Sequence, residues 1–315
     1  MKAVIRSTAV ILAFIILSLA GCRSNPALAP TEGTIEVTGG KVWYRIIGEG
    51  NETPLLLLHG GPGGTSWSFY TLAELSEDRP MILFDQLGSG RSYTDMDTSL
   101  MTLDSYVEQL KEFTTALGLN EFYLLGHSWG TTLGLAYYTG YPEGIEAMIF
   151  NSPCFSTQLW IRDADSLIGT LPDSIQVVID DAIEKKEFDT PEFRQAERVY
   201  NRNFLLRGEV IFNAFDTAPA HMNTEIYETM WGPCEFIATG TLKDLDLVHM
   251  LDDIEVPTLF VTGEFDEASP STVRYFQSLT PGSKFELIEG AGHATMHDNL
   301  PQNLQVIRDF LNELD

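Results

Sequence analysis

Short apolar runs alternate along the chain with segments whose apolar residues recur at helical spacing. The runs are rich in Val, Ile, Leu and Phe, as buried strands are. We expect strands near residues 34–38, 41–47, 55–59, 81–85, 122–126, 147–151, 258–263 and 284–288. Over residues 103–113 the apolar positions follow i, i+3, i+4, i+7 spacing, and Gly118 then provides a helix C-terminal cap. This alternation predicts an α/β fold whose mostly parallel, eight-stranded sheet has helices on both faces.

The alternation fails over residues 155–239. Amphipathic helical patterns take its place at 174–186 and 191–206, which predicts an inserted helical cap. The core would then comprise residues 34–154 and 240–315. Residues 22–33, which include two prolines, are predicted to form a tether.

Charge narrows the choice of partners. Acidic residues outnumber basic ones by 45 to 19, so the formal net charge is −26 at pH 7. Nucleic acid and anionic lipid would both repel such a chain. We therefore expect no nucleic-acid partner and no membrane binding driven by charge.

The first residues have the pattern of a secretory signal. A basic start precedes the apolar residues 9–20, a stretch too short to span a bilayer comfortably. It ends in Leu19-Ala20-Gly21-Cys22, which resembles a bacterial lipobox. The resemblance implies removal of residues 1–21, lipidation of Cys22 and an exported protein lipid-anchored to the cell envelope. Because Arg23 is not the aspartate that retains many lipoproteins at the inner membrane, an outer-membrane destination stays open.

Two further cysteines remain after lipidation of Cys22. Cys154 and Cys234 can pair in an exported protein, and the bridge would fasten the cap to the core. Two separate buried thiols are the alternative, because two cysteines alone do not define a disulfide framework.

The pentapeptide Gly126-His127-Ser128-Trp129-Gly130 has the form GxSxG. A predicted strand precedes it and a helical segment follows it, which is the context of a nucleophile elbow. The serine of such an elbow has a strained backbone, and glycines two positions before and after it avoid steric collisions. We therefore expect Ser128 to be a nucleophile.

A serine nucleophile needs a base and an orienting acid. Asp266 lies just past the strand 258–263, and His293 follows the strand 284–288, so the chain order is Ser, Asp, His. His297 is the nearest rival base, but its position favours a helix-start or surface histidine. The rival acids Asp252 and Asp253 precede the strand and so fall at its wrong end.

Acyl transfer also needs donors for the developing oxyanion. The strand 55–59 runs directly into Gly60-Gly61-Pro62-Gly63-Gly64, whose backbone can approach a ligand closely. A backbone N–H from this loop and that of Trp129 would hold the oxygen. The chain has no HExxH pattern and no CxxC pair, so its motifs indicate no metal.

Six ordered motifs together carry a resemblance that covers the chain from about residue 34 to its C-terminus. They are His59-Gly-Gly-Pro-Gly63, Asp85-Gln-Leu-Gly-Ser-Gly-Arg-Ser92, Gly126-His-Ser-Trp-Gly130, Trp231-Gly-Pro-Cys-Glu-Phe236, Gly263-Glu-Phe-Asp-Glu267 and Gly290-Ala-Gly-His293. In this set the chain resembles the proline iminopeptidase family of α/β hydrolases, in particular the branch of the tricorn-interacting aminopeptidase. Leu87 departs from the arginine common in the family, which bears on the subfamily more than on the chemistry.

The resemblance implies a set of roles and substrates. Ser128 would be the nucleophile, Asp266 the orienting acid and His293 the base. Gly61 and Trp129 would be the oxyanion donors. Glu235 and Glu267 would bind the free amine of short peptides or aminoacyl amides. The implied activity is a serine exopeptidase that releases an N-terminal residue, preferably proline, without a cofactor.

The residues also fit several alternative interpretations. Glu235 and Glu267 are also explained as ordinary solvated carboxylates. Six aromatic residues would either wall a pocket for the first residue or pack the cap: Phe155, Trp160, Phe212, Phe215, Trp231 and Phe236. The same triad serves a broader aminopeptidase, an amino-acid amidase or an esterase, and a non-catalytic binding lipoprotein is the remote alternative. Haloalkane dehalogenases and epoxide hydrolases attack with aspartate, so Ser128 argues against both.

Overall fold

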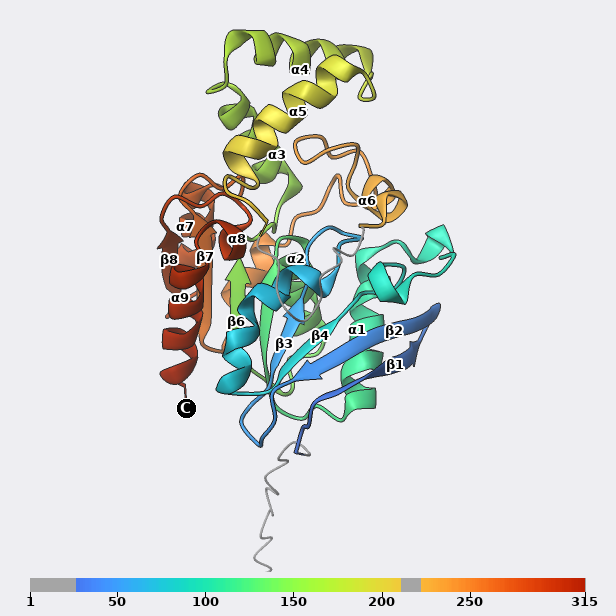
Figure 1. Ribbon diagram of the computed structural model, residues 1–315, viewed down its shortest axis with the longest axis vertical. Helices are drawn as coiled ribbons and strands as arrows, with labels where there is room; N and C mark the ends of the chain where they lie inside the picture. Colours follow the sequence, from blue (N-terminus) through green and yellow to red (C-terminus); the bar gives the residue numbers. More distant parts are fainter. Residues whose placement is uncertain (1–26, 211–221, 315) are drawn as a thin grey trace, which may run out of the picture.

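The computed structural model describes residues 27–210 and 222–314, and its centre is a single large sheet. The sheet has eight strands in the order β1-β2-β4-β3-β5-β6-β7-β8 (Figure 1). Their bounds are β1 Thr31–Val37, β2 Gly40–Ile47, β3 Leu55–Leu58, β4 Met81–Phe84, β5 Phe122–His127, β6 Ile145–Asn151, β7 Thr258–Gly263 and β8 Lys284–Ile288. The predicted eight-stranded sheet is therefore confirmed.

Most of the sheet is parallel. Only β1 with β2 and β2 with β4 pair antiparallel, whereas β3 to β8 join through parallel pairs. Every residue of β3 and β7 is buried, because both faces of the sheet are covered. Parallel strands end at a common edge, and loops at that edge are where open α/β sheets bind ligands.

Helices cover the two faces of the sheet. One face packs against α1 (Leu103–Leu117), α2 (Trp129–Gly140) and α7 (Pro270–Ser278). The other packs against the 3₁₀ helix Ser66–Glu77, α8 (Thr295–Asp298) and α9 (Leu300–Asn312). The predicted cap of α1 is present, since Gly118 adopts a φ of 67° directly after the helix. The remaining 3₁₀ segments are Gly90–Ser92, Thr98–Leu100 and Val248–Asp253.

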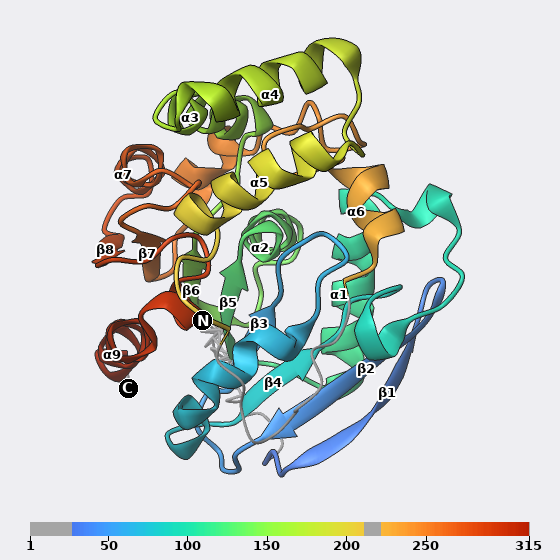
Figure 2. The same cartoon turned by 45° about the horizontal axis from the view of Figure 1, so that its top comes forward.

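Four α-helices lie between β6 and β7 in the described chain. They are α3 (Thr157–Ile168), α4 (Asp173–Lys185), α5 (Pro191–Phe204) and α6 (Thr224–Met230). Figures 1 and 2 show α3, α4 and α5 beyond the end of the sheet toward which β6 points. These three helices share a small core of their own, built around Ile179, Phe193 and Tyr200. The two expected amphipathic helices are thus present as α4 and α5.

The N-terminal boundary differs from the expected tether. Thr31, Glu32 and Gly33 are the first residues of β1 and pair with β2, and Leu28 already forms a bridge with Gly50. The burial of β1 alternates and most of its residues are exposed, so the sequence pattern there resembles a linker more than a strand. The expected signal peptide 1–21 and Cys22 lie outside the described residues.

The structure also bears on membrane spans and on the cysteines. Within residues 27–210 and 222–314, no helix combines the length and apolar character needed to cross a bilayer. Cys154 and Cys234 are both buried free thiols, so the disulfide alternative is not adopted.

Candidate active site

Ser128 occupies a sharp turn between β5 and α2. Its backbone has φ 53° and ψ −126°, a conformation that side-chain-bearing residues rarely adopt. A Cβ on Gly126 would lie 2.5 Å from the carbonyl oxygen of Gly130, and one on Gly130 would lie 1.9 Å from that of Leu58. Only glycine fits at both positions. The two glycines of the pentapeptide therefore relieve the steric crowding around Ser128, as predicted.

His293 and Asp266 form a buried pair at the same edge of the sheet. His293 follows β8, Asp266 follows β7, and 2.8 Å separates His293 Nδ1 from Asp266 Oδ1. The two residues are only 3% and 1% exposed, which leaves little room for water to compete for this contact. The hydrogen bond fixes the orientation of the imidazole ring, as the acid of a triad does.

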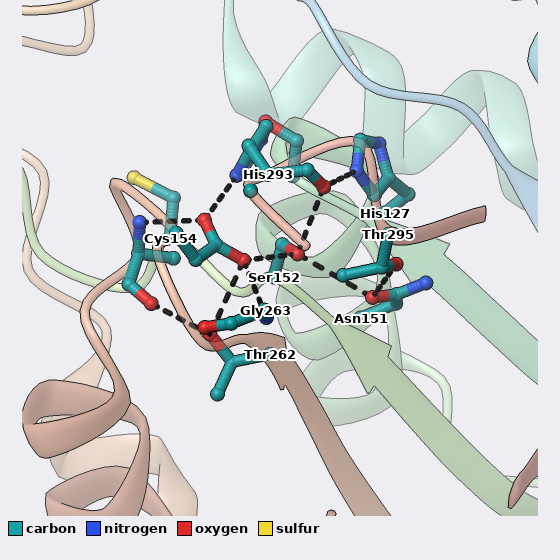
Figure 3. Close-up of polar contacts among 12 residues, drawn as sticks. His127, Asn151, Ser152, Cys154, Thr262, Gly263, His293 and Thr295 are labelled. Atoms are coloured by element: carbon teal, nitrogen blue, oxygen red, sulfur yellow. Dashed lines mark hydrogen bonds and ion pairs between the residues drawn. The ribbon is translucent and has the colours of Figure 1, made fainter. Parts of the chain in front are cut away.

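Asp266 is held by further donors, among them Ser152, Thr262 and Gly263, which are labelled in Figure 3. Its Oδ2 accepts hydrogen bonds from Ser152 Oγ at 2.6 Å, Gly263 N at 3.1 Å and Thr262 Oγ1 at 3.2 Å. Its Oδ1 also accepts one from Ala268 N at 2.8 Å. Burial alone would raise the pKa of this carboxyl, but His293 and the hydrogen bonds outweigh it and lower the pKa. Asp266 therefore stays ionised despite its burial.

The proton affinity of His293 is high. Burial alone would lower the pKa of His293, but Asp266 and the more remote Glu267 and Glu235 raise it to about 9. Nearby His127 behaves in the opposite way, because burial lowers its pKa to about 3 and leaves it neutral. The neutral His127 ring lies 4.8 Å from that of His293, and its Nε2 contacts the backbone oxygen of His293 at 3.0 Å.

Two cavities meet at Ser128. We call the more enclosed one, of about 310 Å³, the inner cavity; it is lined by Gly61, Pro62, Ser128, Trp129, Thr132, Cys154, Trp160, Trp231, Glu235, Leu242 and Leu245. The outer cavity, of about 660 Å³, is lined by Gly60, Gly61, Gly64, Thr65, Trp67, Ser68, His127, Ser128, Leu205, Met222, Tyr227, Glu235 and His293. Within the described chain, Nε2 of His293 has no hydrogen-bond partner. Ser128 and His293 share the outer cavity, and a reacting group there can reach both.

The two expected oxyanion donors border the same space. Gly61 has a φ of 119°, and a Cβ there would lie 2.5 Å from the backbone nitrogen of Gly64. Trp129 is the first residue of α2, so its N–H has no acceptor within the helix. Its indole donates a 2.8 Å hydrogen bond to Gln86, whose side-chain amide donates one of 3.0 Å to the backbone oxygen of His59. This chain of contacts ties the start of α2 to the glycine loop.

Glu235 and Glu267 are not ordinary solvated carboxylates. Glu267 is fully buried, and Glu235 is half-buried and lines both cavities. Burial and the charge of Glu235 raise the pKa of Glu267 well above its usual range, and burial also raises that of Glu235. Two adjacent carboxylates in so little water form a site suited to a cation.

Two tyrosines of the cap accompany the carboxylates. Tyr200 approaches Glu267 and Tyr227 approaches Glu235 closely enough to offset a part of the rise in the pKa of each carboxyl, which burial keeps raised. Both tyrosine hydroxyls and both oxygens of Glu267 nevertheless lack a well-formed hydrogen bond within the described chain. These buried polar atoms can satisfy a donor that enters the site.

The aromatic candidates divide between core and cavity. Trp160 and Trp231 line the inner cavity, whereas Phe155 packs against Phe150 in the sheet core and Phe236 packs against Tyr200. Phe212 and Phe215 lie outside the described residues. The indoles of Trp160 and Trp231 both donate to the backbone oxygen of Glu235, at 2.9 and 3.2 Å.

The rival site residues lie elsewhere. His297 is in α8 and stacks on Trp67 with ring centroids 6.1 Å apart. Asp252 and Asp253 are exposed at the end of a 3₁₀ helix that precedes β7. In the part of the chain that the structure describes, no group of three or more His, Cys, Asp or Glu residues is arranged to hold a metal.

Sequence reasoning missed Ser152, Gln86, Tyr200 and Tyr227. Ser152 was identifiable in part, because it lies just past β6 at the edge where strand ends meet. Tyr200 is one apolar position in an amphipathic helix, and nothing in that pattern distinguishes a residue beside the site from a core residue. Cys22 lies outside the described residues.

Known proteins resemble this chain in both sequence and fold. Residues 53–300 match the family model of the alpha/beta hydrolase fold. The chain is 43% identical to the proline iminopeptidase of Heyndrickxia coagulans over 90% of this chain and 99% of that protein. The crystal structure of VinJ superposes with a TM-score of 0.83 at 28% identity, over 91% of this chain and 100% of that one. The proline iminopeptidase of Mycobacterium smegmatis has a TM-score of 0.79 at 27% identity, over 90% and 98%.

Proposed function

Because the chain belongs to the proline iminopeptidase family of α/β hydrolases, we propose that it is a serine exopeptidase that releases an N-terminal residue, preferably proline, from short peptides. The observation that carries the proposal is the position of Glu235, which lines both cavities beside Ser128. A carboxylate there binds the free ammonium of a substrate through a charge-assisted hydrogen bond. Binding of the ammonium places the carbonyl of the first residue at Ser128, so cleavage occurs after that residue.

The reaction is an acyl transfer to Ser128. His293 accepts the serine proton as the oxygen attacks the carbonyl of the first residue. The N–H groups of Gly61 and Trp129 stabilise the oxyanion, and Asp266 stabilises the imidazolium that forms. The imidazolium then protonates the departing amine, and water hydrolyses the acyl-enzyme in a second round.

The substrate's ammonium is recognised by charge, and the side chain of its first residue is recognised by the shape of the inner cavity. Glu235 and Glu267 receive the ammonium. Burial is the main reason that the pKa of each carboxyl is raised, and for Glu267 the charge of Glu235 raises it further. The side chain of the first residue enters the inner cavity, where Trp160, Trp231 and Leu242 provide apolar contacts. Preference for proline over other small apolar residues rests on the names of the relatives.

A broader aminopeptidase or amino-acid amidase is the second candidate. The observation in its favour is the inner cavity itself, whose apolar lining contacts the side chain of the first residue without a group that distinguishes an imino acid from an amino acid. The two candidates share every proposed catalytic step and differ only in the preferred first residue.

The test is a panel of aminoacyl anilides and their N-acetylated counterparts, assayed with wild type, Ser128→Ala and Glu235→Gln. The proposal predicts that wild type cleaves proline anilide fastest, and that acetylation and Glu235→Gln each lower kcat/KM at least about a hundredfold, as for a lost charge-assisted contact. Equal cleavage of free and acetylated substrates would indicate an esterase or general amidase. Full activity of Ser128→Ala would overturn the mechanism.

We also propose that the protein is exported and anchored to the cell envelope through a lipid on Cys22. The support is the sequence Leu19-Ala20-Gly21-Cys22 after a short apolar stretch with a basic start. The test is partition of the full chain between water and detergent after expression in a bacterial host. Wild type should enter the detergent phase and Cys22→Ala should not; equal partition of the two would contradict the anchor.

A further inference from the structure

The two cavities differ in their access to His293. Ser128, Gly61 and Glu235 border both of them, but His293 lines only the outer one. The outer cavity alone is lined by the apolar side chains of Trp67, Leu205 and Met222, none of which takes part in the proposed chemistry. In an acyl-transfer mechanism, the cavity that His293 lines is the one that holds the leaving group.

Breakdown of the first tetrahedral intermediate requires a proton on the leaving nitrogen. His293 donates that proton, so the leaving nitrogen must lie on the His293 side of Ser128. The inner cavity has no contact with His293 and therefore receives the side chain of the acyl residue. The residue after the scissile bond is directed into the outer cavity.

We propose that Trp67, Leu205 and Met222 form a subsite that selects an uncharged, apolar residue after the scissile bond. This subsite rests on the proposed exopeptidase function. It adds a second determinant of specificity to the first-residue pocket and the amine-binding carboxylates.

The platform of the subsite is rigid on one side. Trp67 is only 7% exposed and stacks on His297 with an interplanar angle of 19°, so the indole is fixed before substrate arrives. A side chain that packs on a preordered aromatic surface loses little binding energy to reordering of the protein. Burial lowers the pKa of His297, which keeps this supporting ring neutral.

The rim of the subsite carries little charge. Met222 is 42% exposed and lines the outer cavity, so its side chain is accessible to a ligand there. Among the described lining residues, Glu235 is the only carboxylate and none is Lys or Arg. In the reactive state, in which His293 is neutral so that it can accept the serine proton, an acidic second residue would be repelled by Glu235 and would meet no Lys or Arg among the described lining residues. An apolar residue gains contact with Trp67 and Met222.

The first experiment compares proline amide, whose leaving group is ammonia, with prolyl-leucine amide. Trp67→Leu keeps an apolar side chain while it removes the indole surface. We expect its kcat/KM for prolyl-leucine amide to fall about tenfold more than its kcat/KM for proline amide, the size typical of a lost pocket contact. Equal losses on the two substrates would show that Trp67 only supports the fold and would overturn the subsite.

The second experiment changes the charge at the rim, where folding is not at risk. Met222→Lys should raise the ratio of kcat/KM for prolyl-glutamate amide over prolyl-leucine amide several-fold, since the ammonium supplies the missing counter-ion. Val177→Lys is the matched control, because Val177 is 65% exposed on α4 and lines neither cavity. An unchanged ratio in Met222→Lys, or the same change in Val177→Lys, would overturn the subsite. Failure of wild type to cleave proline amide and proline anilide would instead refute the proposed function.

Discussion

Ser152 donates a 2.6 Å hydrogen bond to Oδ2 of Asp266, although 114 positions separate the two residues in the chain. The other oxygen of the same carboxylate contacts Nδ1 of His293. Ser152 itself has a φ of 54° and also contacts the backbone oxygen of His293 at 3.1 Å. It is therefore a positioning residue that orients the carboxylate of Asp266 and contacts the backbone of His293.

Replacement of Ser152 by alanine removes one donor from Asp266 and leaves the others in place. A hydrogen bond to a charged group contributes about 1.5–3 kcal/mol, so we expect kcat to fall roughly tenfold or more with KM nearly unchanged. Steady-state kinetics on proline anilide measures this. Ser89→Ala is the matched control, because Ser89 is also fully buried but its hydroxyl has no partner within the described chain. Equal rates in the two variants would show that Ser152 is not a positioning residue for Asp266.

The pH dependence of the free enzyme follows from the pKa of His293. Only the neutral imidazole accepts a proton, and carboxylates that raise its pKa to about 9 hold it protonated at neutral pH. For an ester substrate without a titrating amine, kcat/KM should therefore rise with pH until about pH 9. Glu235→Gln removes a negative charge that raises this pKa, so the rising limb should move to lower pH. A limb at the ordinary histidine pKa of about 6.5 in wild type would contradict the electrostatics.

Trp160 links amine recognition to the base. Its indole N–H donates to the backbone oxygen of Glu235 at 2.9 Å, and its ring meets that of His293 edge-on at 5.4 Å. Trp160→Phe keeps a ring and loses the donor, so we expect KM for proline anilide to rise about two- to tenfold, the range for one hydrogen bond. The same variant should discriminate less between free and N-acetylated anilides.

The control for Trp160 is Trp43→Phe, which also removes an indole donor. Trp43 donates to Glu32 at 2.8 Å, away from both cavities. The ratio of free to acetylated rates should stay at the wild-type value in Trp43→Phe. A ratio that falls equally in the two variants would mean that Trp160 acts through general stability alone.

Gly61→Ala tests the oxyanion site, because this substitution changes the position of a backbone N–H. Alanine there conflicts with a φ of 119° and with the nitrogen of Gly64, so the loop must shift and move its N–H. We expect kcat to fall on the order of a hundredfold, as when one oxyanion donor is lost. Gly118→Ala is the control, since Gly118 also has a positive φ but open space at its Cβ, away from the site. An active Gly61→Ala enzyme would exclude this loop from oxyanion binding.

The sequence predicted the sheet well because its strands are buried on both faces. Runs such as Leu55–Leu58 and Thr258–Gly263 cannot be mistaken for surface segments, and each ends in a loop that carries a site residue. The start of β1 was missed for the opposite reason. Thr31 to Gly33 belong to an exposed edge strand, whose order comes from pairing with β2 and not from burial.

The candidate site was predictable where local motifs carry it. The backbone strain at Ser128 requires small neighbours, so Gly126 and Gly130 mark the turn in sequence. Contacts that single side chains make with residues distant in the chain have no local sequence motif. The partners of Ser152 and Trp160 lie more than seventy positions away in the chain, and only the folded chain brings them together.

The central claim is that Ser128 forms an acyl-enzyme with the first residue of a substrate that has a free amine. The direct measurement is acid quenching during turnover of proline p-nitrophenyl ester, followed by digestion and mass spectrometry of the peptide that contains Ser128. We predict a mass increase of one prolyl group on Ser128, absent in Ser128→Ala and greatly reduced with the N-acetylated ester. A prolyl group on any other residue, or equal labelling by the free and acetylated esters, would contradict the claim.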